Sequence, residues 1–200
     1  METNDAGIGV EEVQTTGIAH LIERGIESAK WTIERWANEE DKANGVQYSE
    51  EECMRLFGTK EQVSVINADM VPGHGNILVN AGINALWTLV CGTGGTKFDN
   101  TNAYLGVGDS NTAAAAGQTD LQAATNKLRV AMNASYPTYG TSQQAVWQSD
   151  FTSAQANYAW EEFAVFNAST AGTMLNRKTS SQGTKTSGQT WRLTLTITLS

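Results

Sequence analysis

Apolar residues in the first quarter of the chain recur at steps of three and four, the spacing that places side chains on one face of an α-helix. The pattern starts near Thr15 and ends near Asn44-Gly45, a pair typical of a helix C-terminus. Charged side chains take the other face. An isolated helix of this length is marginally stable in water, so the apolar stripe predicts a partner surface. The candidate partner-binding residues are Ile18, Leu21, Ile22, Ile26, Ile33 and Trp36.

Two further helices are expected before the midpoint of the chain. Ser49 followed by Glu52 predicts a capping box that opens a short helix, and Gly58 ends it. A strand could occupy part of residues 60–70, before a Pro-Gly-His-Gly break. Apolar residues in the segment 76–91 cover most of a helical circumference, so we expect this second helix to be well buried.

After residue 95 the period of the pattern changes from 3.6 to 2, which indicates strands. The alternation is clearest in residues 191–199, where Trp, Leu and Ile alternate with Arg and Thr. Short strands separated by Gly, Pro, Ser and Asn are typical of an antiparallel sandwich. The other predicted strands are 104–107, 127–135, 144–152, 160–167 and 172–178.

The expected fold class is therefore α+β and mainly β: an antiparallel β-sandwich with a buried helix, preceded by an acidic helical arm. The arm is residues 1–75 and the β-domain residues 76–200, and we expect the β-domain to fold without the arm. Residues 1–75 contain fifteen acidic and six basic side chains, a net of −9, against six and seven, a net of +1, in residues 76–200. This charge disfavours nucleic acid and anionic membranes as partners and favours a basic protein surface.

Histidine and cysteine offer little chemistry in this chain. His20 and His74 have no second ligand at the spacing of a metal site. Cys53 and Cys91 form no metal-type pair and are expected to be reduced core residues. No signal peptide and no apolar run long enough for a membrane span are apparent, so the chain is expected to be made and assembled in a cytoplasm.

A glycine-rich segment and three aspartates are candidate ligand sites. Gly106-Val107-Gly108-Asp109 lacks the third glycine of a dinucleotide-binding loop. Asp99, Asp109 and Asp120 could supply oxygens to Ca²⁺, but their spacing matches no Ca²⁺ loop. The sequence therefore predicts no metal, no cofactor, no small-molecule substrate and no enzymatic activity.

One glutamate is expected to be paired inside the β-domain. Glu161 shares a face with apolar neighbours if residues 160–167 form a strand, and a carboxylate in such a place needs a partner. Arg129 and Arg177 are the strand-borne candidates, and we predict a structural ion pair with Glu161. Three strand tryptophans are expected to be core anchors, with an aromatic platform for carbohydrate as the alternative: Trp147, Trp160 and Trp191.

Three stretches of the C-terminal part occur in an order that resembles structural proteins of tailed bacteriophages. The first, GNILVNAGI from residue 75, leads to AYLGVGDS from residue 103. The others are ANYAWEEFAVFN from residue 156 and the segment from residue 175 to WRLTLTITL. Together they are similar to the β-domain of head decoration or minor capsid proteins and of some tail-fibre and baseplate proteins. The resemblance implies a particle-building role and no catalytic residues.

The first hypothesis is thus a head decoration (cement) or minor capsid protein, located in the virion after assembly in the host cytoplasm. Its partners would be the major capsid protein or other virion proteins, bound through the N-terminal arm, with self-association as a further possibility. The second hypothesis is a tail-fibre, collar or baseplate component. The third is a carbohydrate-active enzyme, which would need two carboxylates in one cleft.

Overall fold

The computed structural model describes residues 28–68 and 76–199, which contain ten strands and three helices. The helices are α2 (Glu39–Ala43), α3 (Glu50–Phe57) and α4 (Asn80–Cys91). The strands are β1 (Ser28–Trp36), β2 (Val63–Ala68), β3 (Asn76–Leu78), β4 (Tyr104–Gly108), β5 (Lys127–Ala131), β6 (Thr138–Thr141), β7 (Gln144–Phe151), β8 (Glu162–Phe166), β9 (Met174–Thr179) and β10 (Thr190–Thr198).

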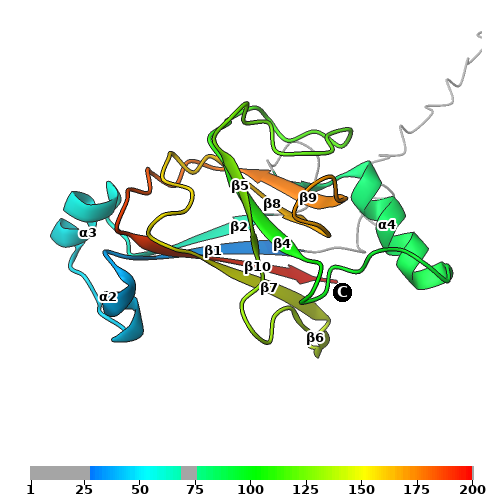
Figure 1. The fold of residues 1–200 in the computed structure, drawn as a ribbon, viewed down its shortest axis with the longest axis horizontal. Coiled ribbons are helices and arrows are strands. Elements are labelled where there is room, and N and C mark those ends of the chain that lie inside the picture. Colours follow the sequence, from blue (N-terminus) through cyan, green and yellow to red (C-terminus); the bar gives the residue numbers. More distant parts are fainter. Residues whose placement is uncertain (1–27, 69–75, 200) are drawn as a thin grey trace, which may run out of the picture.

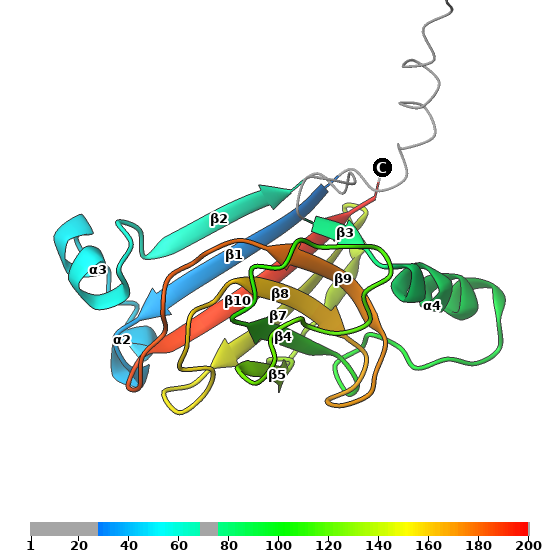
Figure 2. The same cartoon turned by 90° about the horizontal axis from the view of Figure 1, so that it is seen from above.

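The strands form two antiparallel sheets of five strands each. Sheet A has the order β2-β1-β10-β7-β6 and sheet B the order β3-β9-β8-β4-β5. The views in Figures 1 and 2 show the sheets stacked on one another, with α2 and α3 at one end and α4 at the other. The predicted fold class, mainly β with an antiparallel sandwich, is confirmed.

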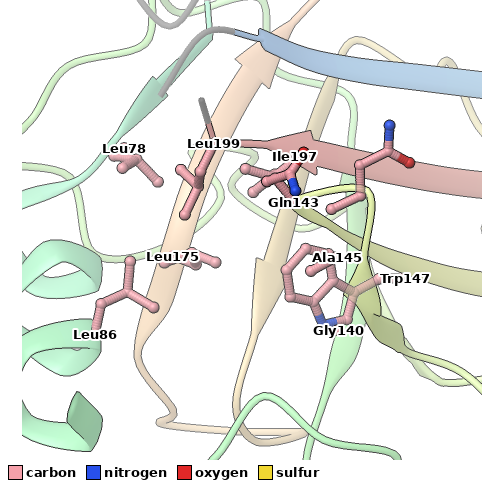
Figure 3. Close-up of a pocket in the computed structure, with 10 residues that line it drawn as sticks. Leu78, Leu86, Gly140, Gln143, Ala145, Trp147, Leu175, Ile197 and Leu199 are labelled. Atoms are coloured by element: carbon pink, nitrogen blue, oxygen red, sulfur yellow. The ribbon is translucent and has the colours of Figure 1, made fainter. Parts of the chain in front are cut away.

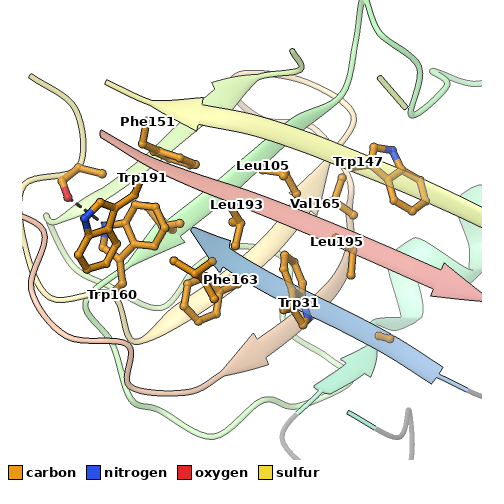
Figure 4. Close-up of a cluster of buried hydrophobic side chains, with 14 of the residues drawn as sticks. Trp31, Leu105, Trp147, Phe151, Trp160, Phe163, Val165, Trp191, Leu193 and Leu195 are labelled. Atoms are coloured by element: carbon orange, nitrogen blue, oxygen red, sulfur yellow. Dashed lines mark hydrogen bonds between the residues drawn. The ribbon is translucent and has the colours of Figure 1, made fainter. Parts of the chain in front are cut away.

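The core lies between the sheets because alternate residues of each strand point inward (Figure 4). On β10 the predicted alternation is confirmed from Trp191 to Ile197, whose apolar members are buried. Aromatic rings from the two sheets meet there: the centroid of Trp31 on β1 lies 5.8 Å from that of Phe163 on β8. The three candidate tryptophans are core residues, as predicted, and none offers an exposed platform: Trp147, Trp160 and Trp191.

The predicted N-terminal helix is wrong at residues 28–36, and of its described residues only the last turn is helical, as α2 (Glu39–Ala43). Residues 28–36 form β1, which pairs with β10 on one side and β2 on the other. Ile33 is fully buried and Trp36 is nearly so, because both belong to the core region of the sandwich rather than to an exposed stripe. The other residues of the predicted stripe lie outside the described part of the chain: Ile18, Leu21, Ile22 and Ile26.

The predicted domain boundary is wrong for the same reason. β1 and β2 lie before residue 75, yet they complete sheet A beside β10 from the C-terminus. Residues 28–68 therefore contribute to the same core as residues 76–199. The short helix α3 is as predicted: the Ser49 amide donates to Glu52 Oε2 at 2.9 Å, the Glu52 amide donates to Ser49 Oγ at 3.3 Å, and Gly58 ends the helix.

The outer face of sheet B is covered by the irregular segment 109–126. Leu121 packs there against Phe166, Met174 and other residues of the sheet. Gly106 and Gly108 allow this close packing, since a Cβ on Gly106 would lie 2.8 Å from the Phe166 ring. The glycine-rich segment that invited a phosphate-loop interpretation is thus a packing feature of β4.

Candidate interaction surface

Backbone hydrogen bonds hold the N-terminus of α4 against β9 and the segment 109–126. The Val79 amide donates to the Leu175 carbonyl at 3.1 Å, and the Asn80 amide donates to the Ala116 carbonyl at 2.9 Å. Gly82 is the one buried residue of the helix, and a Cβ in its place would overlap the Leu175 backbone. Glycine therefore lets the helix backbone lie directly on the strand.

The expectation that this helix is well buried is wrong. Its inner side packs partly on the core through Ala85, Leu86 and Leu89. Its opposite side carries apolar residues at i, i+4 and i+7 that face solvent, which we call the outer stripe. The exposed fractions in the outer stripe are 36% for Ile83, 62% for Trp87 and 74% for Val90. Cys91, predicted to be a core residue, is exposed as well, whereas Cys53 is buried as expected.

An open apolar groove of about 420 Å³ lies beside α4 (Figure 3). It is formed where β3, α4, the β6–β7 hairpin and the end of β10 come together. Leu86 of α4 lines it, so the outer stripe and the groove are neighbours on the same end of the molecule. The lining residues are Leu78, Leu86, Gly140, Gln143, Gln144, Ala145, Trp147, Leu175, Ile197 and Leu199.

The β6–β7 turn forms one rim of this groove. Ser142 and Gln143 both have φ of 52°, in the left-handed region that non-glycine residues rarely adopt. A two-residue hairpin turn of the primed type requires positive φ at both positions. The turn holds the exposed Gln143 at the rim, and that residue contributes an amide rather than a charge.

Charge is distributed unevenly between the two ends of the sandwich. Residues 76–96, 130–149 and 193–199, which form much of the α4 end, contain no Asp, Glu, Lys or Arg, and the start of β1 adds the exposed Lys30 opposite Thr196. Residues 38–61, which build the α2–α3 end, contain seven acidic and three basic side chains, a net of −4. One end is therefore apolar and poor in charge, and the other is acidic.

The predicted ion pair exists with a different glutamate. Arg177 Nε lies 2.7 Å from Oε2 of Glu162, and both side chains are fully buried. Glu161 instead accepts a hydrogen bond from Ser181 Oγ at 2.8 Å. Phe163 faces the core between the sheets. Its neighbour Glu162 therefore points to the outer face of sheet B, where the segment 109–126 buries it, and this is why Glu162 rather than Glu161 is the paired residue. That segment supplies two amide donors to the Glu162 carboxylate, from Gln122 at 2.8 Å and Ala123 at 2.7 Å.

Arg129 pairs with an aspartate rather than with Glu161. Its Nη2 lies 2.8 Å from Oδ1 of Asp120, and its guanidinium carbon lies 3.5 Å from the centre of the Phe166 ring. Burial would raise the pKa of Asp120, but hydrogen bonds from Lys127 and Arg129 hold that pKa below its usual value. Within residues 28–68 and 76–199, no group of three or more His, Cys, Asp or Glu side chains could hold a metal ion.

Two other buried cations, Lys185 and Arg35, donate hydrogen bonds to segments that are distant in the sequence. Burial lowers the pKa of Lys185 to about 8, and its Nζ donates to the Thr152 carbonyl at 2.7 Å and to Asn157 Oδ1 at 2.8 Å. Burial also lowers the pKa of Arg35 to about 10. The Arg35 guanidinium donates to Gln182 Oε1 at 3.2 Å. Both cations thus connect segments that are distant in sequence.

Replacing Gly82 by alanine is expected to destabilise the protein. In an exposed helix this change would add about 1 kcal/mol of stability. Here the new Cβ overlaps the Leu175 backbone, so α4 must move away from β9. We expect a net loss of about 1–3 kcal/mol in urea denaturation. Gly117→Ala, where a Cβ meets nothing within 4 Å, is the control, and an equal loss in both variants would contradict this account.

Of the predicted partner-binding residues, Ile33 and Trp36 are buried in the core, and the others lie outside the described residues. The helix predicted within residues 76–91 is α4, but an apolar circumference without charge is as typical of a contact surface as of a buried helix. No helix in the described part of the chain is both long and apolar enough to cross a membrane.

In comparisons with known proteins, the chain matches no protein-family model, no curated protein and no solved structure.

Proposed function

We propose that this chain is a structural component of a tailed-phage particle, a head decoration (cement) or minor capsid protein that acts through contacts with other proteins. The observation that carries the proposal is the outer stripe of α4 beside an open apolar groove. A contiguous exposed apolar area of this kind is typical of an interaction site. The order of the segments that resemble phage structural proteins agrees with this role, and the first of them includes the start of α4.

The two ends of the sandwich suit different contacts. At the α4 end, burial of the outer stripe in a contact would contribute about 1.5–3 kcal/mol of binding free energy per side chain before ordering costs. The acidic α2–α3 end would orient the protein toward a basic surface and speed the encounter, an effect that salt weakens. Ile33 and Trp36 do not take part in this attachment, because both are buried in the core, and the ends of the sandwich are proposed in their place.

Particles of the phage that encodes this chain test the proposal directly. After gradient purification, the chain is expected to sediment with the particles at a fixed copy number, measured by quantitative mass spectrometry. Labelling of the chain in electron micrographs is expected on the head. Label on the tail would support a fibre, collar or baseplate component instead, and absence from the particles would refute both assignments.

Trp87→Lys is expected to reduce the amount of particle-bound chain at least about tenfold, which corresponds to 1.4 kcal/mol of binding free energy. A charge in the outer stripe would have to be desolvated in the contact, whereas in the free protein it stays in water. The melting temperature should not change by more than about two degrees, since the side chain is largely exposed. Val65→Lys is the matched control, because Val65 is a half-exposed apolar residue on the edge strand β2 and belongs neither to the outer stripe nor to the α2–α3 end.

A further inference from the structure

We infer that the apolar groove is the docking site of the chain's own N-terminal segment, residues 1–27, which lies outside the described part of the chain. The inference goes beyond the proposed function, because it concerns the free protein and leaves the outer stripe of α4 to other proteins. The side of the segment that enters the groove is its predicted apolar stripe: Ile18, Leu21, Ile22 and Ile26.

The N-terminal segment joins the fold at the edge of the groove. Ser28, the first residue of β1, pairs with Thr198 of β10, and the following residue, Leu199, lines the groove (Figure 3). Ile26 precedes Ser28 by two residues, so its backbone lies within about 7 Å of the start of β1. A tether this short gives the segment an effective concentration in the millimolar range, which a separate partner in dilute solution does not reach.

The groove and the predicted stripe match in size and chemistry. The wall of the groove consists of Leu, Ile, Ala and Trp side chains, and its volume of about 420 Å³ holds several aliphatic side chains. Trp147 Nε1 already donates to the Phe98 carbonyl at 3.0 Å, so this polar atom needs no partner from an occupant. On a helix, Ile18 and Ile26 lie about 12 Å apart on one side. Such a helix is marginally stable alone, and the groove supplies the surface it needs.

Charge directs the segment to this end of the molecule. Residues 1–27 contain six acidic side chains and one basic side chain, a net of −5. None of the described residues that line the groove is charged, and the nearby start of β1 carries the exposed Lys30. The α2–α3 end, with a net of −4 in residues 38–61, would repel the segment. A docked segment therefore meets no opposing charge at the groove, whereas it would at the other end.

Tryptic cleavage of the full-length protein after Arg24 tests the inference, because Arg24 is the one Lys or Arg in residues 1–27. Ile18→Asp is expected to speed this cleavage at least about tenfold, since cleavage follows the population of the undocked segment. His20→Asp is the matched control: it adds the same charge two residues away, on the opposite side of the predicted helix, and its cleavage rate should stay within about twofold of the wild type.

Substitutions in the described part of the chain test the groove itself. Leu199→Asp is expected to speed cleavage after Arg24 as Ile18→Asp does, although the two substituted residues are far apart in the sequence. Val90→Asp is its control, because Val90 belongs to the outer stripe and not to the groove, and the cleavage rate should not change. Circular dichroism melts of all variants establish that each is folded.

A disulfide cross-link identifies the occupant. With Cys91 replaced by serine, Ile22→Cys and Gln143→Cys are expected to form a disulfide within one chain under mild oxidation, because Gln143 is exposed at the rim of the groove. His20→Cys in place of Ile22→Cys should form much less of it. Chains linked to each other on a non-reducing gel would show that a second copy supplies the occupant and would overturn the inference.

Three further results would overturn it: equal cleavage of the wild type and Ile18→Asp, no effect of Leu199→Asp, or no disulfide with Gln143→Cys. Particle binding is a separate measurement. An unprotected Arg24 in a chain that binds particles contradicts only the docking of the segment. A protected Arg24 in a chain absent from particles contradicts only the virion role.

Discussion

A chain that begins at Asn76 is expected not to fold, although it contains all of sheet B and the strands β6, β7 and β10 of sheet A. β1 pairs with β10 over nine residues, from Ser28 opposite Thr198 to Trp36 opposite Thr190. Its removal exposes the full edge of β10 and deletes two fully buried core side chains, Trp31 and Ile33. Replacing a core Trp or Ile by alanine alone costs about 3–5 and 2–5 kcal/mol. The sum rivals the whole stability of a typical domain, about 5–15 kcal/mol.

The measurement is a thermal melt followed by circular dichroism, in which the shortened chain should show no cooperative transition. Within the full chain, Trp31→Ala should lower the free energy of unfolding by about 3–5 kcal/mol. Thr32→Ala is the control, because Thr32 is on the same strand but only partly buried, and its effect should stay below about 1 kcal/mol. A cooperative melt of the chain from Asn76 would show that β1 is an attachment rather than part of the core.

Glu162→Gln is expected to cost about 3–5 kcal/mol, the range for breaking a buried ion pair by removing one partner. The substitution leaves the Arg177 guanidinium buried without a counter-charge. It also weakens the acceptor of the Gln122 and Ala123 amides, which hold the segment 109–126 on sheet B. Urea denaturation at low temperature gives the free energy of unfolding, and faster proteolysis within residues 109–126 would report the loosened segment.

Glu161→Gln is the matched control, since the neighbouring carboxylate accepts from Ser181 at an exposed site. Its effect should lie within about 0.5 kcal/mol. The double variant Glu162→Gln/Arg177→Met should be less destabilised than the sum of the single variants, because it removes both charges. Equal effects of the two glutamate substitutions would contradict the assignment of the buried pair.

All strands after residue 100 except β6 (Thr138–Thr141) were predicted, because each of them has a local signature. In β10 a period of 2 runs without interruption over seven residues, and it persists in the structure from Trp191 to Ile197. The capping box of α3 was equally local, since both of its hydrogen bonds join residues three apart. Such signals need no knowledge of the rest of the fold.

Residues 28–36 were not predictable in the same way, because their apolar residues fit both the spacing of a helix and the alternation of a strand. Ile33 and Trp36 are three residues apart, which fits a helix, whereas Ala29, Trp31 and Ile33 alternate, which fits a strand. Arg35 obscures the strand pattern, because a charged residue takes the next inward position. It is accommodated by a cation–π contact 4.8 Å from the centre of the Trp191 ring and by Gln182, from distant parts of the chain.

The sequence by itself determined the fold class, most strand positions after residue 100 and the asymmetry of charge, because these depend on local period and composition. Only the tertiary structure decided that β1 completes sheet A, that Glu162 rather than Glu161 pairs with Arg177, and that Trp87 faces solvent. Each of these depends on which distant segments cover a given face. The type of an apolar residue does not indicate whether its side chain is buried in its own fold or in a contact with a partner. The sequence alone therefore cannot separate a core from a contact surface.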